Sequence, residues 1–451
     1  MPQSSWLVSA RFLQLAEWLK SARCAADRSA RMLIESKSAS AVADHLFRHE
    51  AGRMIARLTR TFGPHRFDLA EEAVQDALCT ALETWKFYGI PDDPGAWLMR
   101  VARNRAIDLI RRGRRFEGIL DALAVEPSSV CVADVEGDWP HDDRLLLIFS
   151  CCDPLVSVDA QLALILKALC GFSLGEIGAA LFASPSAIEK RVTRTKGFLK
   201  RSKSLFDFTD AGQVRTRLDS VHQALYLIFS EGYHSVRADA PVRDELCREA
   251  IRLALLIAVD RTIGTPATDA LLAMMYLDLA RLAGRVDEEG VFLPLSRQDR
   301  SRWDQRLIAV GFRYLGASAK GGELSRYHLE AAIAAEHCRA SSFEQTDWRR
   351  ILELYEMLAF MSPTPVVALN RAIVRGQVDG AVAGLAALDA LGRNDFFKTY
   401  PFFHAAFGEF RLRNAEVDEA AVAFRRALEC ARSTGERNFF VRRLTELKGC
   451  F

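Results

Sequence analysis

Long apolar stretches are missing from this 451-residue chain. No run of about 18 apolar residues occurs, so no membrane-spanning helix is predicted. Glycine and proline are scarce, at 27 and 14 residues, which excludes a fibrous or a largely disordered chain. The formal net charge is only +2. Any contact with nucleic acid must therefore come from local basic segments.

Metal-binding and catalytic motifs are missing as well. Cys151 and Cys152 are adjacent, and no CxxC is matched by a second CxxC or by an HxxxH. His45 and His49 are one helical turn apart, but no cysteine or acidic cluster completes a metal site. Reduced thiols in the cytoplasm are therefore expected, and no metal or cofactor is predicted. The chain also lacks Walker, GxSxG, HExxH and glycine-rich phosphate motifs, which disfavours an enzyme.

The first 38 residues lack the continuous apolar core of a signal peptide. Their apolar residues give some amphipathic character: Trp6, Phe12, Leu15, Trp18 and Leu19. Two interpretations stay open, a leader of uncertain order and a start codon assigned too early.

Residues 97–115, WLMRVARNRAIDLIRRGRR, form an arginine-rich amphipathic segment with seven arginines and one acid. A helix of this kind neutralises phosphates with its arginines, while Asn104 and Asp108, one turn apart, could hold bases. A turn-rich loop precedes it at residues 89–95. The aromatics around this loop suit the stacking of unpaired bases. Two of them, Trp85 and Trp97, are instead expected in the core.

Residues 172–201 have the pattern of a helix, a tight turn and a second, basic helix. Ser184 followed by a proline predicts a capped start for the second helix, and Ile188 and Val192 predict its buried edge. Its outer face resembles a helix that reads a DNA major groove. An ordinary hairpin with a charged face is the alternative. Phe182 stands where many such turns have glycine, so the turn is expected to be built differently.

These segments together resemble a known family. The stretch DLAEEAVQDAL at 68–78, PGAWL at 94–98 and ARNRAIDLIRR at 102–112 are similar to region 2 of an extracytoplasmic-function (ECF) sigma factor. The segment at 172–201 is similar to region 4. Four further motifs resemble the ECF subgroup with a long C-terminal domain of tetratricopeptide-like repeats: FSCCDP at 149–154, LIFSEGY at 227–233, DRSRWD at 299–304 and ALNRA at 368–372. The likeness covers roughly residues 40–450.

The resemblance implies two partners, core RNA polymerase and promoter DNA. In this family region 2 binds the polymerase and opens the −10 element, and region 4 reads the −35 element. The residues implied for polymerase binding are Glu72, Gln75 and Asp76. Those implied for −10 DNA are Asn104, Asp108, Arg111 and Arg112, with the loop at 86–96. Those implied for −35 DNA are Ser186, Glu189, Lys190, Arg191 and Arg194.

The expected fold is all-α, because no strand pattern of consequence appears. The domains expected after the leader are a helical bundle at 39–115, a linker at 116–142, a small helix-turn-helix domain at 143–203 and a C-terminal part at 215–451. This last part reads as helix pairs, clearest at 404–431 with a weaker copy at 367–391. The two lie about 40 residues apart, against 34 in a regular tetratricopeptide array, so they are only repeat-like.

The role of the C-terminal part stays open. Basic and acidic residues balance from Asp210 onward, so this part is not expected to bind DNA. It is either a passive extension or a regulator in cis that contacts the sigma modules or a protein partner. The motif at 299–304 either docks on those modules or caps a helix with a buried tryptophan. A conventional helix-turn-helix regulator with a helical sensing domain is the alternative for the whole protein.

Overall fold

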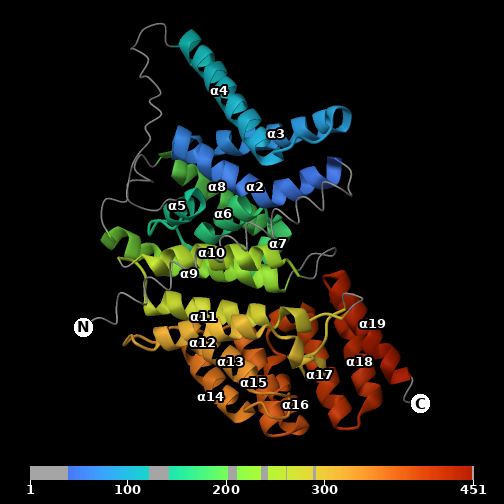
Figure 1. The fold of residues 1–451 in the computed structure, drawn as a ribbon. Coiled ribbons are helices and arrows are strands. Elements are labelled where there is room, and N and C mark those ends of the chain that lie inside the picture. The colour runs from blue at the N-terminus through green and yellow to red at the C-terminus, as the bar shows by residue number, and fades with distance from the viewer. Residues whose placement is uncertain are drawn as a thin grey trace. The chain divides into compact units, whose positions relative to one another are not determined.

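A computed structural model shows an all-α chain, as the sequence predicts (Figure 1). The structure describes residues 39–120, 142–201, 211–234, 242–260, 262–287 and 291–448, without the side chains of 39–49, 64, 113–120 and 211. Across these residues no strand forms, and one isolated β-bridge joins Val286 and Phe292. The expected leader, most of the expected linker and residues 202–210 lie outside the described residues, as do the side chains of His45 and His49.

The chain divides into two compact units, residues 1–228 and 229–451. The division falls inside one helix, α9 (Ala211–Tyr233). The sequence analysis placed the start of the C-terminal part at residue 215. In the structure, the N-terminal part of α9 groups with the first unit.

Three helices form the first part of unit 1: α2 (Ala39–Phe62), α3 (Phe67–Tyr88) and α4 (Pro94–Leu120). Each packs on the other two. The buried face of α3 is apolar at helical spacing, from Phe67 through Trp85. This face leaves the acidic residues of α3 on the other side, as amphipathic periodicity requires.

Four shorter helices follow: α5 (Asp143–Cys151), α6 (Val158–Cys170), α7 (Leu174–Ala180) and α8 (Pro185–Arg201). Helices α5 and α6 pack against α2, and α7 and α8 pack against α6 and against each other. At the crossing of α2 and α6, a Cβ added to Gly52 would lie 2.1 Å from the carbonyl oxygen of Leu169. Backbone therefore meets backbone at this crossing, and only glycine fits there.

Unit 2 begins with the last residues of α9 and continues as a succession of antiparallel helices, of which the first are α10 (Asp244–Val259) and α11 (Pro266–Ala280). Almost every side chain of α11 is buried, so this helix is central to its neighbours. The remaining helices are α12 (Gln305–Ser318), α13 (Arg326–Arg339), α14 (Trp348–Met361), α15 (Pro365–Val378), α16 (Ala381–Leu391), α17 (Pro401–Arg413), α18 (Val417–Glu429) and α19 (Thr434–Lys448).

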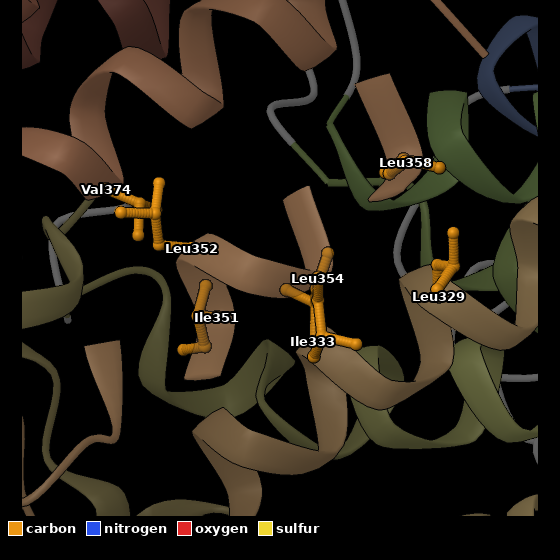
Figure 2. Close-up of a cluster of buried hydrophobic side chains, with 7 residues drawn as sticks. All are labelled: Leu329, Ile333, Ile351, Leu352, Leu354, Leu358 and Val374. Carbon is orange, nitrogen blue, oxygen red and sulfur yellow. The ribbon is translucent and has the colours of Figure 1, made fainter. Parts of the chain in front are cut away.

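Each helix of unit 2 packs on the next, so its core is a row of local clusters. Figure 2 shows the cluster formed by α13, α14 and α15, to which they contribute Ile333, Leu354 and Val374 respectively. The expected helix pairs are present as α15 with α16 and α17 with α18. In the second pair a Cβ on Gly408 would lie 2.7 Å from the ring of Phe424, so a small residue faces a large one.

The motif at 299–304 is a capped turn. Asp304 accepts hydrogen bonds from Arg306 N and Leu307 N at the start of α12. The Trp303 side chain beside it is 3% exposed. Arg300 donates to the carbonyl oxygen of His337 at 2.8 Å. These contacts agree with the helix-cap interpretation of this motif.

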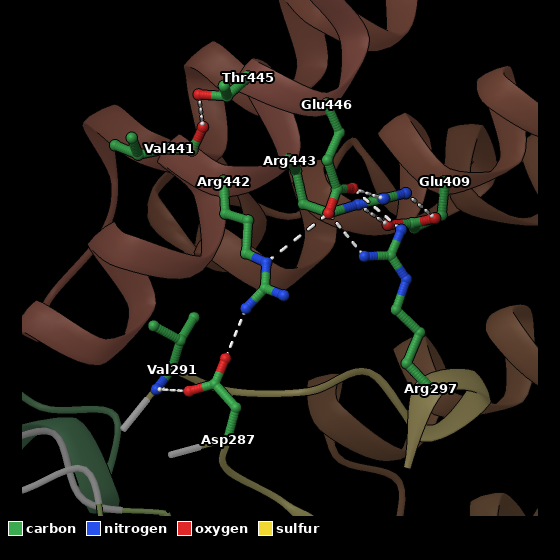
Figure 3. Close-up of polar contacts among 9 residues, drawn as sticks. All are labelled: Asp287, Val291, Arg297, Glu409, Val441, Arg442, Arg443, Thr445 and Glu446. Carbon is green, nitrogen blue, oxygen red and sulfur yellow. Dashed lines mark hydrogen bonds and ion pairs between the residues drawn. The ribbon is translucent and has the colours of Figure 1, made fainter. Parts of the chain in front are cut away.

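Ion pairs fasten α19 to the loop after α11 (Figure 3). Arg442 lies 2.5 Å from a carboxylate oxygen of Asp287, and Arg297 lies 2.6 Å from one of Glu446. Arg443 also pairs with Glu446 and, at 2.8 Å, with Glu409 of α17. The last helix of unit 2 is thereby held to segments far from it in sequence.

Candidate nucleic-acid interface

The exposed side of α4 carries the residues predicted to meet −10 DNA. Arg100, Asn104 and Asp108 follow one another at four-residue spacing, and all three are exposed. Arg111 and Arg112 continue this row and are exposed too. Leu98, Ala102 and Ala106 are fully buried on the opposite side. The helix therefore presents a row of arginines that also contains an amide and a carboxylate.

Two aromatic side chains stand free where α3 ends. Phe87 and Tyr88 are 78% and 87% exposed, directly before the loop that leads to α4. Trp85 is buried, as expected, and its ring lies 5.5 Å from that of the half-buried Trp97. The four aromatics thus separate into a pair that packs in the core and a pair that is available for stacking. The sequence already distinguishes these pairs, because only Trp85 and Trp97 of the four aromatics beside the loop are expected in the core.

The three residues predicted for polymerase binding differ in their surroundings. Glu72 and Gln75 are exposed on α3. Asp76 is half-buried, and its carboxylate accepts a hydrogen bond from Arg105 Nε at 2.5 Å. In the sequence, Arg105 is only one of the arginines of its helix. The structure turns it inward against α3.

The α7–α8 segment has the geometry of a helix-turn-helix. Ser173 and Glu176 form a capping box at the start of α7, and Ser184 Oγ accepts from Ala187 N at the start of α8. A Cβ on Gly178 would lie 2.5 Å from the carbonyl oxygen of Ala183, so the turn passes very close to α7. The tight contact explains why small residues fill this segment.

The turn between α7 and α8 uses a left-handed residue that is not glycine. Phe182 has φ 51° and its side chain is 54% exposed. Left-handed backbone disfavours residues with a Cβ by about 1–2 kcal/mol. The expectation of a different construction is therefore wrong, because Phe182 adopts the backbone conformation that glycine usually supplies.

Helix α8 buries one edge and exposes the other. Ile188, Val192, Thr195 and Leu199 are buried. Four of the five residues predicted to read −35 DNA are exposed: Ser186, Glu189, Lys190 and Arg194. The fifth, Arg191, is half-buried, and its guanidinium lies 3.2 Å from the carboxylate of Asp159 on α6. Arg191 is therefore positioned by α6, a contact that the sequence did not reveal.

The C-terminal half of α8 pairs with the acidic start of α3. Lys196 makes ion pairs with Glu71 and, at 3.6 Å, with Asp68, and Lys200 also pairs with Asp68. The Lys196 ammonium also lies 5.7 Å from the centre of the Phe67 ring. In this arrangement two lysines that could neutralise DNA phosphates are occupied by carboxylates. Sequence reasoning did not identify these pairs.

The buried thiols of Cys151 and Cys152 are unsuited to nucleophilic chemistry. Burial raises the pKa of Cys151 to about 12 and that of Cys152 well above its ordinary value, with Arg217 opposing both shifts. The thiolate, which is the reactive form, is therefore absent at neutral pH. No group of residues suited to hold a metal ion occurs in the parts of the chain that the structure describes. Among the described helices, none is long and apolar enough to span a bilayer.

Comparisons with known proteins agree with this geometry. Residues 47–116 match the family Sigma-70 region 2, and residues 217–319 match a family of unknown function, DUF6596. The protein named "Uncharacterized protein R00370" of Rhizobium meliloti (strain 1021) is 35% identical over 386 residues, which cover 84% of this chain and 90% of that protein. No solved structure matches the chain. The region 2 match includes α3 and most of α2 and α4, where the acidic edge and the arginine row lie.

Proposed function

We propose that this chain, whose residues 47–116 match Sigma-70 region 2, is an ECF sigma factor of the sigma-70 family that directs promoter-specific transcription initiation. It binds core RNA polymerase and recognises −35 and −10 promoter elements. The family consists of transcription factors rather than enzymes, and we assign no catalytic residue. Its place of action is the cytoplasm, where polymerase and promoter meet.

The exposed row on α4 is the observation that carries the proposal. Arg100, Arg111 and Arg112 neutralise the backbone of the opened strand, and Asn104 and Asp108 hold bases between them. Phe87 and Tyr88, at the end of α3, give flipped bases a surface on which to stack. Stacking of this kind is worth about 1–3 kcal/mol per base, which offsets the few kcal/mol lost when a base leaves the duplex.

The second DNA contact is the exposed face of α8. Lys190, Arg194, Ser186 and Glu189 meet base edges and phosphates of the −35 element. Arg191 joins them once it is released from Asp159. Each bidentate contact with a base contributes about 1–3 kcal/mol of discrimination. Two weak contacts in one chain reinforce each other through effective concentration.

The exposed edge of α3 binds the polymerase. Glu72 and Gln75 face solvent there, and Asp76 adjoins them. An acidic helix edge pairs with a basic surface on a partner. The same helix also carries Asp68 and Glu71, whose carboxylates pair with the lysines of α8.

The C-terminal helices act in cis as a regulatory domain of the tetratricopeptide-like type. The helix pairs of α15–α18 support this, because arrays of helix pairs offer extended surfaces for protein partners. A chain ending at Tyr233 tests the role. It should change the amount of transcript and leave the start sites unchanged, and a switch to other promoter sequences would contradict the assignment.

Run-off transcription with core polymerase and the full chain tests the main proposal. Initiation from a defined promoter is expected without any other sigma factor. Arg111→Ala with Arg112→Ala should abolish opening of the −10 element, and Lys190→Ala should weaken use of the −35 element. The alternative, a conventional regulator, requires a second sigma factor for any transcript, and that result would replace the proposal.

A further inference from the structure

Within unit 1, the side chain of Arg217 on α9 forms hydrogen bonds at the C-terminal end of α5. Its guanidinium donates to the carbonyl oxygen of Phe149 at 2.9 Å and to Oδ2 of Asp153 at 3.2 Å. The Arg217 and Asp153 side chains are only 13% and 14% exposed. A planar guanidinium suits this double contact, because its donors are held in a fixed fork. Arg217 is also the first residue of the match to the family of unknown function.

Asp153 belongs to the loop between α5 and α6, and side-chain hydrogen bonds fix the shape of this loop. The other carboxylate oxygen of Asp153, Oδ1, accepts from Leu155 N at 2.9 Å. Gln161 of α6, which is 2% exposed, donates from Nε2 to the carbonyl oxygens of Asp153 and Val156, both at 2.7 Å. The motif FSCCDP, noted in the sequence, thereby joins α5 rigidly to the start of α6.

The start of α6 in turn holds α8. Asp159 lies 3.2 Å from the guanidinium of Arg191. The hydroxyl of Thr195, which is 1% exposed, donates to the carbonyl oxygen of Ala160 at 3.3 Å and to that of Arg191 at 2.9 Å. An unbroken series of contacts therefore runs from Arg217 through the α5–α6 loop to the middle of α8.

We propose that Arg217 is a positioning residue for promoter recognition: it fixes the α5–α6 loop, and through that loop it sets where α8 presents Lys190 and Arg194. The proposal rests on the proposed function of α8 as the −35 reader. A recognition side chain must be held within about 0.5 Å and 10–20° of its productive geometry. A small shift of α6 is therefore enough to reduce discrimination between bases, although Arg217 touches no DNA.

The proposal implies that α9 completes the DNA-reading module. Region 4 would not end with α8, since the residue that locks its loop lies on the next described helix. Arg217 would then be required at every −35-dependent promoter and would have little influence on the α4 row, which shares none of these contacts.

Hydrogen exchange on the full chain tests the contact itself. In Arg217→Gln, amides at 185–195 should exchange several-fold faster, while those at 94–112 keep their rates, because local opening follows the lost contacts. Arg217→Lys keeps the positive charge but loses the forked geometry of the guanidinium, so its amides at 185–195 should exchange at an intermediate rate. Arg349→Gln is the matched control, since Arg349 is an exposed arginine of α14.

Transcription with core polymerase gives the functional readout. Arg217→Gln should lower the ratio of transcript from an intact −35 element to that from a substituted one by about tenfold, which is within the range of coupling between contacting residues. Initiation on a template with a pre-melted −10 region should stay at the wild-type level. Asp153→Asn should lower the same −35 transcript ratio by a similar factor. The double variant, Arg217→Gln with Asp153→Asn, should lower it little further.

The outcomes separate cleanly. Unchanged exchange in α8, or an unchanged −35 ratio in a folded Arg217→Gln protein, overturns the positioning role. The positioning role is also overturned if Arg217→Gln and Arg217→Lys both lose both transcription readouts and the thermal unfolding transition. Arg217 is then a general stabiliser of the fold. If the wild-type chain starts no transcript with core polymerase, the proposed function has failed, and the exchange measurement alone decides whether Arg217 positions α8.

Discussion

Arg105 of α4 donates from Nε to Oδ2 of Asp76 on α3 at 2.5 Å. One member of this pair belongs to the predicted polymerase surface, and the other to the arginine helix predicted to meet DNA. Both side chains are about one-third exposed, at 32% for Arg105 and 38% for Asp76. The pair thus links the two contact surfaces of the first helical group.

The Asp76–Arg105 pair separates two variants that would otherwise be expected to behave alike. Asp76→Arg places two guanidinium groups together, so it should lower the free energy of unfolding by about 1 kcal/mol and weaken binding to core polymerase. Glu72→Arg, on the exposed part of the same helix, should weaken polymerase binding with no change in stability. Thermal unfolding and binding to immobilised core polymerase measure the two effects. Equal polymerase affinity in Glu72→Arg and wild type would remove Glu72 from the interface.

The carboxylates of α3 should restrain DNA binding by the free protein. Asp68→Asn with Glu71→Gln releases Lys196 and Lys200, so affinity for duplex DNA should rise at low salt. The plot of log affinity against log salt should steepen by about two, one for each freed cation. Fluorescence anisotropy over a salt series measures this slope. Glu83→Gln, at the far end of α3, is the control, and an identical slope in all three proteins would contradict the prediction.

Two glycines of α7 give a matched test of the helix-turn-helix contact. Gly178→Ala drives a methyl group against the carbonyl oxygen of Ala183, which would lie 2.5 Å away. The expected loss of stability is about 1–3 kcal/mol, with weaker −35 recognition. Gly175→Ala should be neutral or slightly stabilising, because its nearest neighbour, Ser173 Oγ, would be 3.9 Å away. Chemical denaturation of both variants decides, and equal midpoints would show that the α7 contact is looser than described.

His222 of α9 should make stability depend on pH. Burial lowers its pKa from 6.5 to about 4, so the unfolded chain takes up the proton first as the pH falls. The free energy of unfolding should therefore decrease between about pH 6.5 and pH 4, by roughly 3 kcal/mol from this residue. His222→Gln should flatten this part of the curve, as measured by denaturant unfolding at several pH values. A curve parallel to the wild type would assign the dependence to other groups.

The ion pairs of α19 should differ in strength according to their burial. Arg443, which is 11% exposed, pairs with both Glu409 and Glu446, so Arg443→Gln should lower stability by about 2 kcal/mol. Arg426→Gln breaks a pair with Glu429 in which both side chains are more than half exposed, and should leave stability almost unchanged because solvent screens an exposed pair. Thermal melts compare the two variants, and equal losses would refute the distinction.

Sequence periodicity predicted the helices and most of the buried faces. Ile188 and Val192 are buried and Trp85 lies in the core, as the apolar spacing indicated. The capping residue Ser184 was also predicted, because its role depends only on its neighbours in the chain. These features are local, so a short window of sequence contains them.

Contacts between distant residues could not be predicted in this way. The pair between Arg191 and Asp159 removes one arginine from an otherwise exposed face, and nothing in the spacing of α8 indicates it. The pairs of Lys196 with Glu71 and of Arg217 with Asp153 likewise depend on how separate helices pack. Charge pattern alone assigns all of these residues to the surface.

The attachment of α19 has a consequence for how unit 2 unfolds. A row of helix pairs with open ends frays from its ends, because a terminal helix has only one neighbour. Here the terminal helix has a second anchor, since Arg442 reaches Asp287 and Glu436 lies 3.4 Å from His234, at the very beginning of the unit. Because the last helix is tied to the first segments of the unit, unfolding has no loosely held terminal helix at which to begin. Helix α19 should therefore unfold together with the whole unit rather than before it.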